Sequence, residues 1–166
     1  MSDPRFSQTH YICAGLVPLA DNYNAGGSSD SVDMAQYGHM TCILLGSDTC
    51  AGAGIVTVMG GLTDGAETAA ITFTYRYTST DSKAALGDVL SAPLTSASLT
   101  LVEANIKSGM YVLEWNAEDM VVATVRYRYA TVVLSAAGTA GIVSMVLIGS
   151  QARFQSTYMI PATPIV

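Results

Sequence analysis

Two histidine and cysteine pairs in this chain share one spacing, and both could bind a metal ion. His10 and Cys13 lie in "HYIC", and His39 and Cys42 lie in "HMTC". Imidazole nitrogens and thiolate sulfurs are the ligands of structural zinc sites. Two such pairs would complete a tetrahedral site, so the spacing raises the hypothesis of a bound zinc ion.

The element expected around the second pair argues against that site. The run "HMTCILL" is short and apolar, which predicts a strand in which residues three apart point to opposite faces. His39 and Cys42 would then be unable to bind one ion. We expect Cys42 to be buried with Met40 and Leu44, and His39 to lie near solvent. His10 and Cys13 could still lie on a loop, but we predict no metal and no cofactor.

Catalytic groups are few. Neither histidine lies near a Gly-x-Ser-x-Gly nucleophile elbow. The carboxylate pairs Glu118 with Asp119 and Asp64 with Glu67 could serve glycoside hydrolysis only if they faced each other across a cleft, and adjacent acids in a turn are more often solvated or capping groups. The loop "TDGAET" lacks the ligand spacing of an EF-hand. We predict no catalytic residue and no enzymatic activity.

The composition narrows the function classes further. The 166 residues fit one domain, with 50% hydrophobic and 12% charged residues and a net charge of -6. The seven lysines and arginines form no basic run, so we expect no nucleic-acid binding. The sparse cysteines, Cys13, Cys42 and Cys50, indicate reduced thiols. The first 22 residues have no sustained apolar run, and we expect no signal peptide.

Alternating apolar residues predict that the elements are mostly strands. In "AITFTYRYTST" the residues Ile71, Phe73, Tyr75 and Tyr77 share one face. In "SGMYVLEWNAED" Tyr111, Leu113 and Trp115 share one face, and we expect the single tryptophan to lie in the core. In "VVATVRYRYATVV" the same pattern places two groups on opposite faces of a strand: the apolar group Val125, Tyr127 and Tyr129, and the polar group Thr124, Arg126 and Arg128. The runs "GIVTVMG", "SLTLVEA" and "GIVSMVLIG" also predict strands. Only residues 31–37 and 81–90 are typical of short helices.

One uncharged stretch, residues 129–152, is long enough to span a bilayer, which takes about 20 residues. Its centre, "SAAGTAG", consists of small residues between two segments rich in valine and isoleucine. This pattern favours two buried strands around a turn, so we expect no membrane partner.

These elements predict an all-β protein: an antiparallel β-sandwich, jelly-roll-like, with few short helical turns. We expect an irregular N-terminal arm over residues 1–27 and a single sandwich domain over residues 28–166. Nine tyrosines, eight methionines and few charges suit an adaptable contact surface. Sheet faces such as Thr72 to Thr78 and Thr124 to Arg128 are suited to packing on another protein.

The order of the strands also carries a resemblance. The segments "SVDMAQYGHMTCILL", "GIVTVMGG", "AITFTYRYTST", "SGMYVLEWNAEDM" and "MVLIGSQARFQ" resemble the β-sandwich head decoration proteins of tailed bacteriophages, also called cement or auxiliary capsid proteins. The resemblance covers residues 27–155 and rests on patterned strands. Three cysteines and two histidines depart from the pattern, and no binding residue can be carried over.

The resemblance implies a virion structural protein that binds the major capsid protein on the outer capsid surface as a symmetric oligomer, a trimer, after synthesis in the host bacterial cytoplasm. We expect the arm from Asp3 to Asn24 to contact the capsid. Three alternatives stay open. A tail or fibre component fits the same class, a carbohydrate-binding module needs a platform of two or three exposed aromatics, and a hydrolase or metal-dependent enzyme needs His10, His39 and an acid in one cleft.

Overall fold

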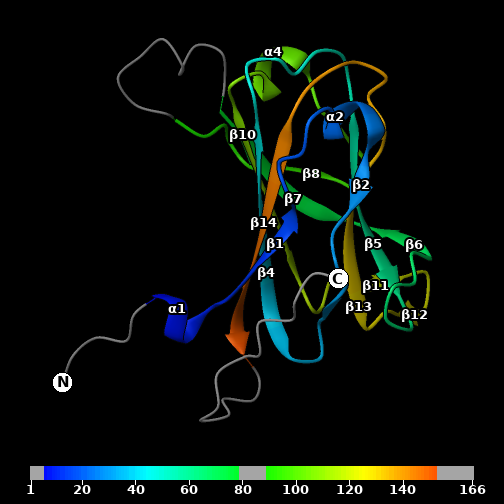
Figure 1. The fold of residues 1–166 in the computed structure, drawn as a ribbon. Helices are drawn as coiled ribbons and strands as arrows, with labels where there is room; N and C mark the ends of the chain where they lie inside the picture. The colour runs from blue at the N-terminus through cyan, green and yellow to red at the C-terminus, as the bar shows by residue number, and fades with distance from the viewer. Residues whose placement is uncertain (1–5, 79–88, 153–166) are drawn as a thin grey trace, which may run out of the picture.

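Strand-forming residues at alternating positions fold into two antiparallel sheets, which the computed structural model describes over residues 6–78 and 89–152 (Figure 1). The first sheet runs in the order β1 (Tyr11–Leu16), β14 (Val143–Ala152), β4 (Tyr37–Gly46), β10 (Met110–Asn116), β7 (Phe73–Tyr77) and β8 (Leu94–Ser96). The second runs in the order β2 (Gly27–Ser28), β13 (Tyr129–Leu134), β5 (Ile55–Gly61) and β6 (Ala69–Ile71); β3 (Val32–Asp33) also pairs with β13, and β9 (Leu99–Thr100) with β5. The predicted all-β sandwich is confirmed.

The strand order is that of a jelly roll. Eight principal strands, taken along the chain, are β1, β2, β4, β5, β6, β10, β13 and β14. The first, eighth, third and sixth are neighbours in one sheet, and the second, seventh, fourth and fifth are neighbours in the other. Every pairing between these described strands is antiparallel. The chain therefore passes repeatedly between the two layers, as in two Greek keys wound together.

The core lies between the sheets and follows the alternation of the sequence. In β10, Tyr111, Leu113 and Trp115 are at most 1% exposed. In β4, the predicted inward set Met40, Cys42 and Leu44 is fully buried. These residues pack with inward side chains of the second sheet, such as Val56, Val58, Val132 and Leu134. The predicted burial of the single tryptophan is confirmed.

The uncharged stretch 129–152 forms two strands, β13 and β14, with a turn region between them. The two strands lie in different sheets, so this stretch crosses from one layer to the other. Among the described residues, none of the helices has the length and apolar character that would let it cross a bilayer.

Two strand predictions need correction. The strand expected from Ile71 to Thr78 divides at Thr72, because β6 belongs to the second sheet and β7 to the first. The strand expected over Thr124 to Tyr129 also divides: β12 (Val125–Arg126) forms a separate hairpin with β11 (Val121–Val122), and β13 begins at Tyr129. In both places the chain turns a corner of the sandwich, which local alternation does not reveal.

The predicted helices and arm differ from the structure as well. The described helices, each a single turn, are α1 (Phe6–Thr9), α2 (Asn22–Ala25) and α4 (Glu103–Ile106). Residues 31–37 contain β3, a turn and the first residue of β4, and residues 81–88 lie outside the described part of the chain. Within residues 1–27, where an irregular arm was expected, Tyr11–Leu16 form β1, which pairs with β14 at the edge of the first sheet, and Tyr23 is fully buried.

Candidate functional site

The residues that raised the zinc hypothesis do not converge on one point. His39 and Cys42 lie on opposite faces of β4, as predicted: the His39 side chain is 24% exposed and Cys42 is fully buried. Burial raises the pKa of the Cys42 thiol, whereas zinc binds the thiolate. The His10 ring stacks on Phe6 with centroids 4.0 Å apart. No three His, Cys, Asp or Glu side chains lie close enough to hold a metal within the described residues.

The carboxylate pairs lie in turns. Asp119 accepts hydrogen bonds from the backbone N–H of Asn116 at 2.8 Å and from its side-chain amide at 3.0 Å, which closes the turn after β10. Its neighbour Glu118 is exposed. Asp64 and Glu67 are exposed in the loop between β5 and β6. These pairs therefore have the surroundings of turn and surface residues.

The outer face of the first sheet carries a band of aliphatic side chains. Alternation turns one set of residues in each strand away from the core, and seven of the outward residues are apolar. We call this set the aliphatic face: Ile12, Ile43, Leu45, Met110, Val112, Val146 and Ile148. Ile12 is 45% exposed and Leu45 46% exposed, and the other five are half-buried. None of the seven belongs to the hydrophobic core or packs against it.

Strand register makes the aliphatic face continuous. Ile12 of β1 lies opposite Ile148 of β14, and Val146 of β14 lies opposite Ile43 of β4. Ile43 in turn lies opposite Val112 of β10. Side chains at such opposed positions are about 5 Å apart and touch. The result is an apolar surface that runs across four neighbouring strands.

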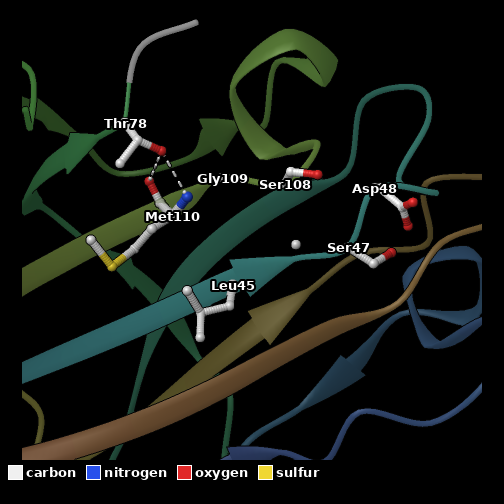
Figure 2. A pocket seen from close by; sticks show the side chains of 8 residues that line it. Leu45, Ser47, Asp48, Thr78, Ser108, Gly109 and Met110 are labelled. Carbon is white, nitrogen blue, oxygen red and sulfur yellow. Dashed lines mark hydrogen bonds between the residues drawn. The ribbon is translucent and has the colours of Figure 1, made fainter. Parts of the chain in front are cut away.

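A pocket lies at one end of the aliphatic face (Figure 2). Its volume is about 530 Å³, and Leu45 and Met110 form its border with the face. Ser47, Asp48 and Ser108 supply polar groups along its lining. The Met110 N–H donates to the Thr78 hydroxyl at 2.9 Å, which ties the start of β10 to the end of β7. The face therefore ends in a concave, partly polar border near α4.

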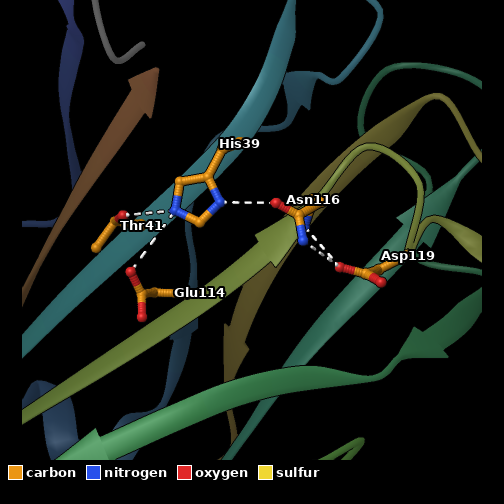
Figure 3. Close-up of polar contacts among 5 residues, drawn as sticks. All are labelled: His39, Thr41, Glu114, Asn116 and Asp119. Atoms are coloured by element: carbon orange, nitrogen blue, oxygen red, sulfur yellow. Dashed lines mark hydrogen bonds and ion pairs between the residues drawn. The ribbon is translucent and has the colours of Figure 1, made fainter. Parts of the chain in front are cut away.

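A polar cluster marks the opposite end of the face (Figure 3). The amide of Asn116 donates to Asp119, so its Oδ1 faces Nδ1 of His39 at 2.9 Å. An amide oxygen only accepts, so Nδ1 of His39 carries a proton. Nε2 of His39 then lies 3.3 Å from the Thr41 hydroxyl and 3.6 Å from a carboxylate oxygen of Glu114. The contacts with Asn116 and Thr41 hold the ring on the surface of the sheet, and the pocket described above does not include it.

The outer face of the second sheet has different chemistry. Thr57 of β5 points outward between the buried residues Val56 and Val58. Thr131 of β13 donates to the Ser31 hydroxyl at 3.3 Å and is only 3% exposed, because the chain near Ser31 covers it. Thr57 lies opposite Val133 and Thr131 lies opposite Met59, so hydroxyl groups alternate with apolar groups on this outer face.

The aromatic side chains form no exposed platform in the part of the chain that the structure describes. Phe6 is 53% exposed, and the tyrosines and the tryptophan in the described ranges are buried or half-buried. A carbohydrate-binding sandwich requires two or three exposed rings side by side. The described surface therefore lacks the feature on which that alternative depends.

The sequence prediction missed the aliphatic face, although a signal for it exists. Strands with one solvated face alternate polar and apolar residues, whereas "CILL" in β4 and "MVLI" in β14 are unbroken apolar runs. Such runs indicate apolar groups on both faces. The surface that the sequence did suggest, Thr72 to Thr78, contributes Thr74 and Arg76 at the margin of this face, opposite Glu114 and Val112.

Comparisons with known proteins complete the description. No protein-family model matches the chain, and no curated protein matches it. A solved structure described as "SPBc2 prophage-derived protein YomS" has a TM-score of 0.48 at 6% identity, covering 84% of this chain and 93% of that one. A structure titled "Bacillus endospore appendages form a novel family of disulfide-linked pili" has a TM-score of 0.30 at 11% identity, covering 90% and 96%. Similarities this distant do not indicate what this chain does.

Proposed function

We propose that this chain is a non-enzymatic structural protein of a tailed-bacteriophage virion, which decorates the outer capsid surface and binds the major capsid protein as a symmetric oligomer. The observation that carries the proposal is the aliphatic face of a jelly-roll sandwich, in which Ile12 and Leu45 are 45% and 46% exposed. Monomeric soluble proteins rarely expose contiguous apolar patches larger than a few hundred Å², and the largest patch on such a protein is often an interaction site. The sequence resemblance to head decoration proteins is the reason for proposing the capsid as the binding partner.

Linkage explains how such a protein would act. A ligand that binds the assembled shell better than its separated subunits stabilises the shell by an amount that rises with the logarithm of its concentration over its dissociation constant. Many copies on a symmetric lattice would then strengthen the capsid without any chemical step. A surface with few charges fits this role, because the contacts with the capsid would then depend on packing and shape complementarity and not on ion pairs.

We propose that the segments before and after β1 contact the capsid. Phe6 is 53% exposed, and Val17 and Leu19, which follow β1, are 46% and 64% exposed. These side chains lie outside the aliphatic face, in the chain region for which capsid contact was expected from the sequence. The two surfaces would let one molecule bind a second copy and the shell at the same time.

The test is co-sedimentation with empty capsids of the phage from which the protein comes. We expect the protein to saturate the capsids at a fixed ratio and to raise the temperature at which they break open. The variant Leu19→Ser should bind less, whereas Leu62→Ser, which changes a leucine 58% exposed in the β5–β6 loop, should bind like the wild type. A wild-type protein that leaves capsids bare would refute the capsid role.

A further inference from the structure

The aliphatic face has the size and charge pattern of a surface that pairs with itself. It extends over β1, β14, β4 and β10 and reaches β7 at Arg76. Five strands spaced by about 4.8 Å and seven residues of β4 rising by about 3.4 Å each give roughly 24 Å by 24 Å. The sheet face therefore has an area on the order of 600 Å² per copy, or about 1,200 Å² for two copies together. Stable interfaces bury about 1,200 Å² or more of surface, counted over both partners.

The charges on the face are balanced, although the whole chain carries a net charge of -6. Arg76 lies opposite Val112, and Glu114 lies opposite Thr74, so the two charged residues are diagonal neighbours at one margin of the face. Arg76 makes no ion pair with any residue in the described part of the chain. The Glu114 side chain is 39% exposed. Arg76, and Glu114 beyond its 3.6 Å contact with His39, therefore remain available to a partner.

We propose that the aliphatic face packs against the same face of a second copy of this chain about a two-fold axis. A patch that contacts its own copy is isologous, so each contact occurs twice. An axis that passes between the two charged positions places Glu114 opposite the partner subunit's Arg76, and Arg76 opposite the partner subunit's Glu114. The aliphatic side chains of the two sheets then interdigitate as the two layers of a sandwich do.

This inference refines the proposed function, on which it rests, by naming the surface through which the oligomer forms. An isologous face produces a dimer, whereas the resemblance to decoration proteins implied a trimer. The dimer would bury the seven residues of the aliphatic face. It would leave Phe6, Val17 and Leu19 exposed for the shell, because none of the three belongs to the face.

Sedimentation equilibrium of the full chain over a range of concentrations tests the proposal. We expect the wild type to have twice the mass of one chain. Ile43→Lys places a charge at the centre of the face and should yield monomers. The matched control Thr57→Lys places the same charge on the outer face of the second sheet and should remain dimeric. Circular dichroism verifies that both variants are folded.

A charge exchange gives the sharper test. Glu114→Arg alone and Arg76→Glu alone should each raise the dimer dissociation constant about tenfold or more, because each places like charges together twice. The double variant R76E/E114R restores opposite charges and should recover most of the affinity. A wild type that is monomeric or trimeric, an Ile43→Lys variant that stays dimeric, or a double variant no tighter than the single ones would overturn the proposal.

Failure of this inference is distinguishable from failure of the capsid role. A dimer that does not bind capsids refutes the capsid role and leaves the two-fold contact in place. Monomers that saturate capsids refute the two-fold contact and leave the capsid role in place.

Discussion

At the scale of single residues, one ion pair joins β3 to the residue that precedes β13. The Arg128 guanidinium donates to both carboxylate oxygens of Asp33, at 3.0 and 2.6 Å. These hydrogen bonds hold the pKa of Asp33 below its usual value. The same carboxylate also accepts from the Ala35 N–H at 3.0 Å. Asp33 thus caps the turn that leads from β3 into β4 and links that turn to Arg128.

The lowered pKa predicts how stability depends on pH. A carboxyl group whose pKa falls on folding contributes stability above its unfolded pKa, near 4, and that contribution is lost as pH falls through the lower folded value. The Arg128 side chain is 57% exposed, so we expect Asp33→Asn to lower the free energy of unfolding at pH 7 by only about 0.5–1 kcal/mol. Urea unfolding at pH 7 and at pH 2 measures the free energies of both proteins, and the difference between them should be smaller at pH 2.

The exposed residue Asp30 supplies the control for this prediction. Asp30→Asn removes a nearby carboxylate that forms no ion pair in the described part of the chain, and it should leave stability at pH 7 unchanged. An Asp33→Asn loss that is equally large at pH 2 would mean that the ion pair is not its source.

At the scale of elements, the side chain of a buried asparagine makes the backbone hydrogen bonds at the start of β14 that a neighbouring strand would otherwise make. The Asn22 side chain in α2 donates to the Val143 carbonyl at 2.6 Å and accepts from the Val143 N–H at 2.8 Å. Its amide also donates to the Val17 carbonyl at 2.9 Å. Asn22 is only 7% exposed, so these groups have little access to water. One side chain therefore joins α2, the end of β1 and the start of β14.

Removal of this amide should be costly. Asn22→Ala leaves a buried N–H and two carbonyl groups without their partner, and we expect it to lower the free energy of unfolding by about 1–3 kcal/mol. Asn24→Ala, two residues further along the same short helix, changes an exposed side chain and is the control. Chemical unfolding followed by tryptophan fluorescence compares the two, and equal effects would contradict the role assigned to Asn22.

At the scale of the whole molecule, the first sheet depends on a strand from the beginning of the chain. β1 covers one side of β14, which pairs with β4 on its other side. Without β1, the ten residues of β14 would present an open edge, and such edges promote aggregation. Residues 11–16 are thus part of the folded sandwich and cannot be separated from it as an arm.

Two truncations test this dependence. Deletion of residues 1–9 keeps β1, and we expect that protein to fold with nearly unchanged stability. Deletion of residues 1–16 removes β1 and should yield a protein that unfolds at lower temperature and aggregates. Thermal unfolding and light scattering distinguish the two, and a stable, monodisperse product of the longer deletion would show that β1 is dispensable.

Period-2 alternation determined much of this protein from the sequence alone. It correctly placed Tyr111, Leu113 and Trp115 in the core, and it correctly put His39 and Cys42 on opposite faces of one strand. It also resolved residues 129–152 into two strands. These features are local, because alternate residues of a strand always point to opposite sides.

Tertiary structure alone decided which strands are neighbours. No local pattern shows that β1 joins β14 across most of the chain, or that the chain changes sheets at Thr72. The aliphatic face is the clearest case: the sequence places Ile43, Val112 and Val146 in three separate apolar runs, and only the pairing of β4, β10 and β14 brings them together. Pairing is set by contacts between distant segments, which a single strand's sequence does not encode.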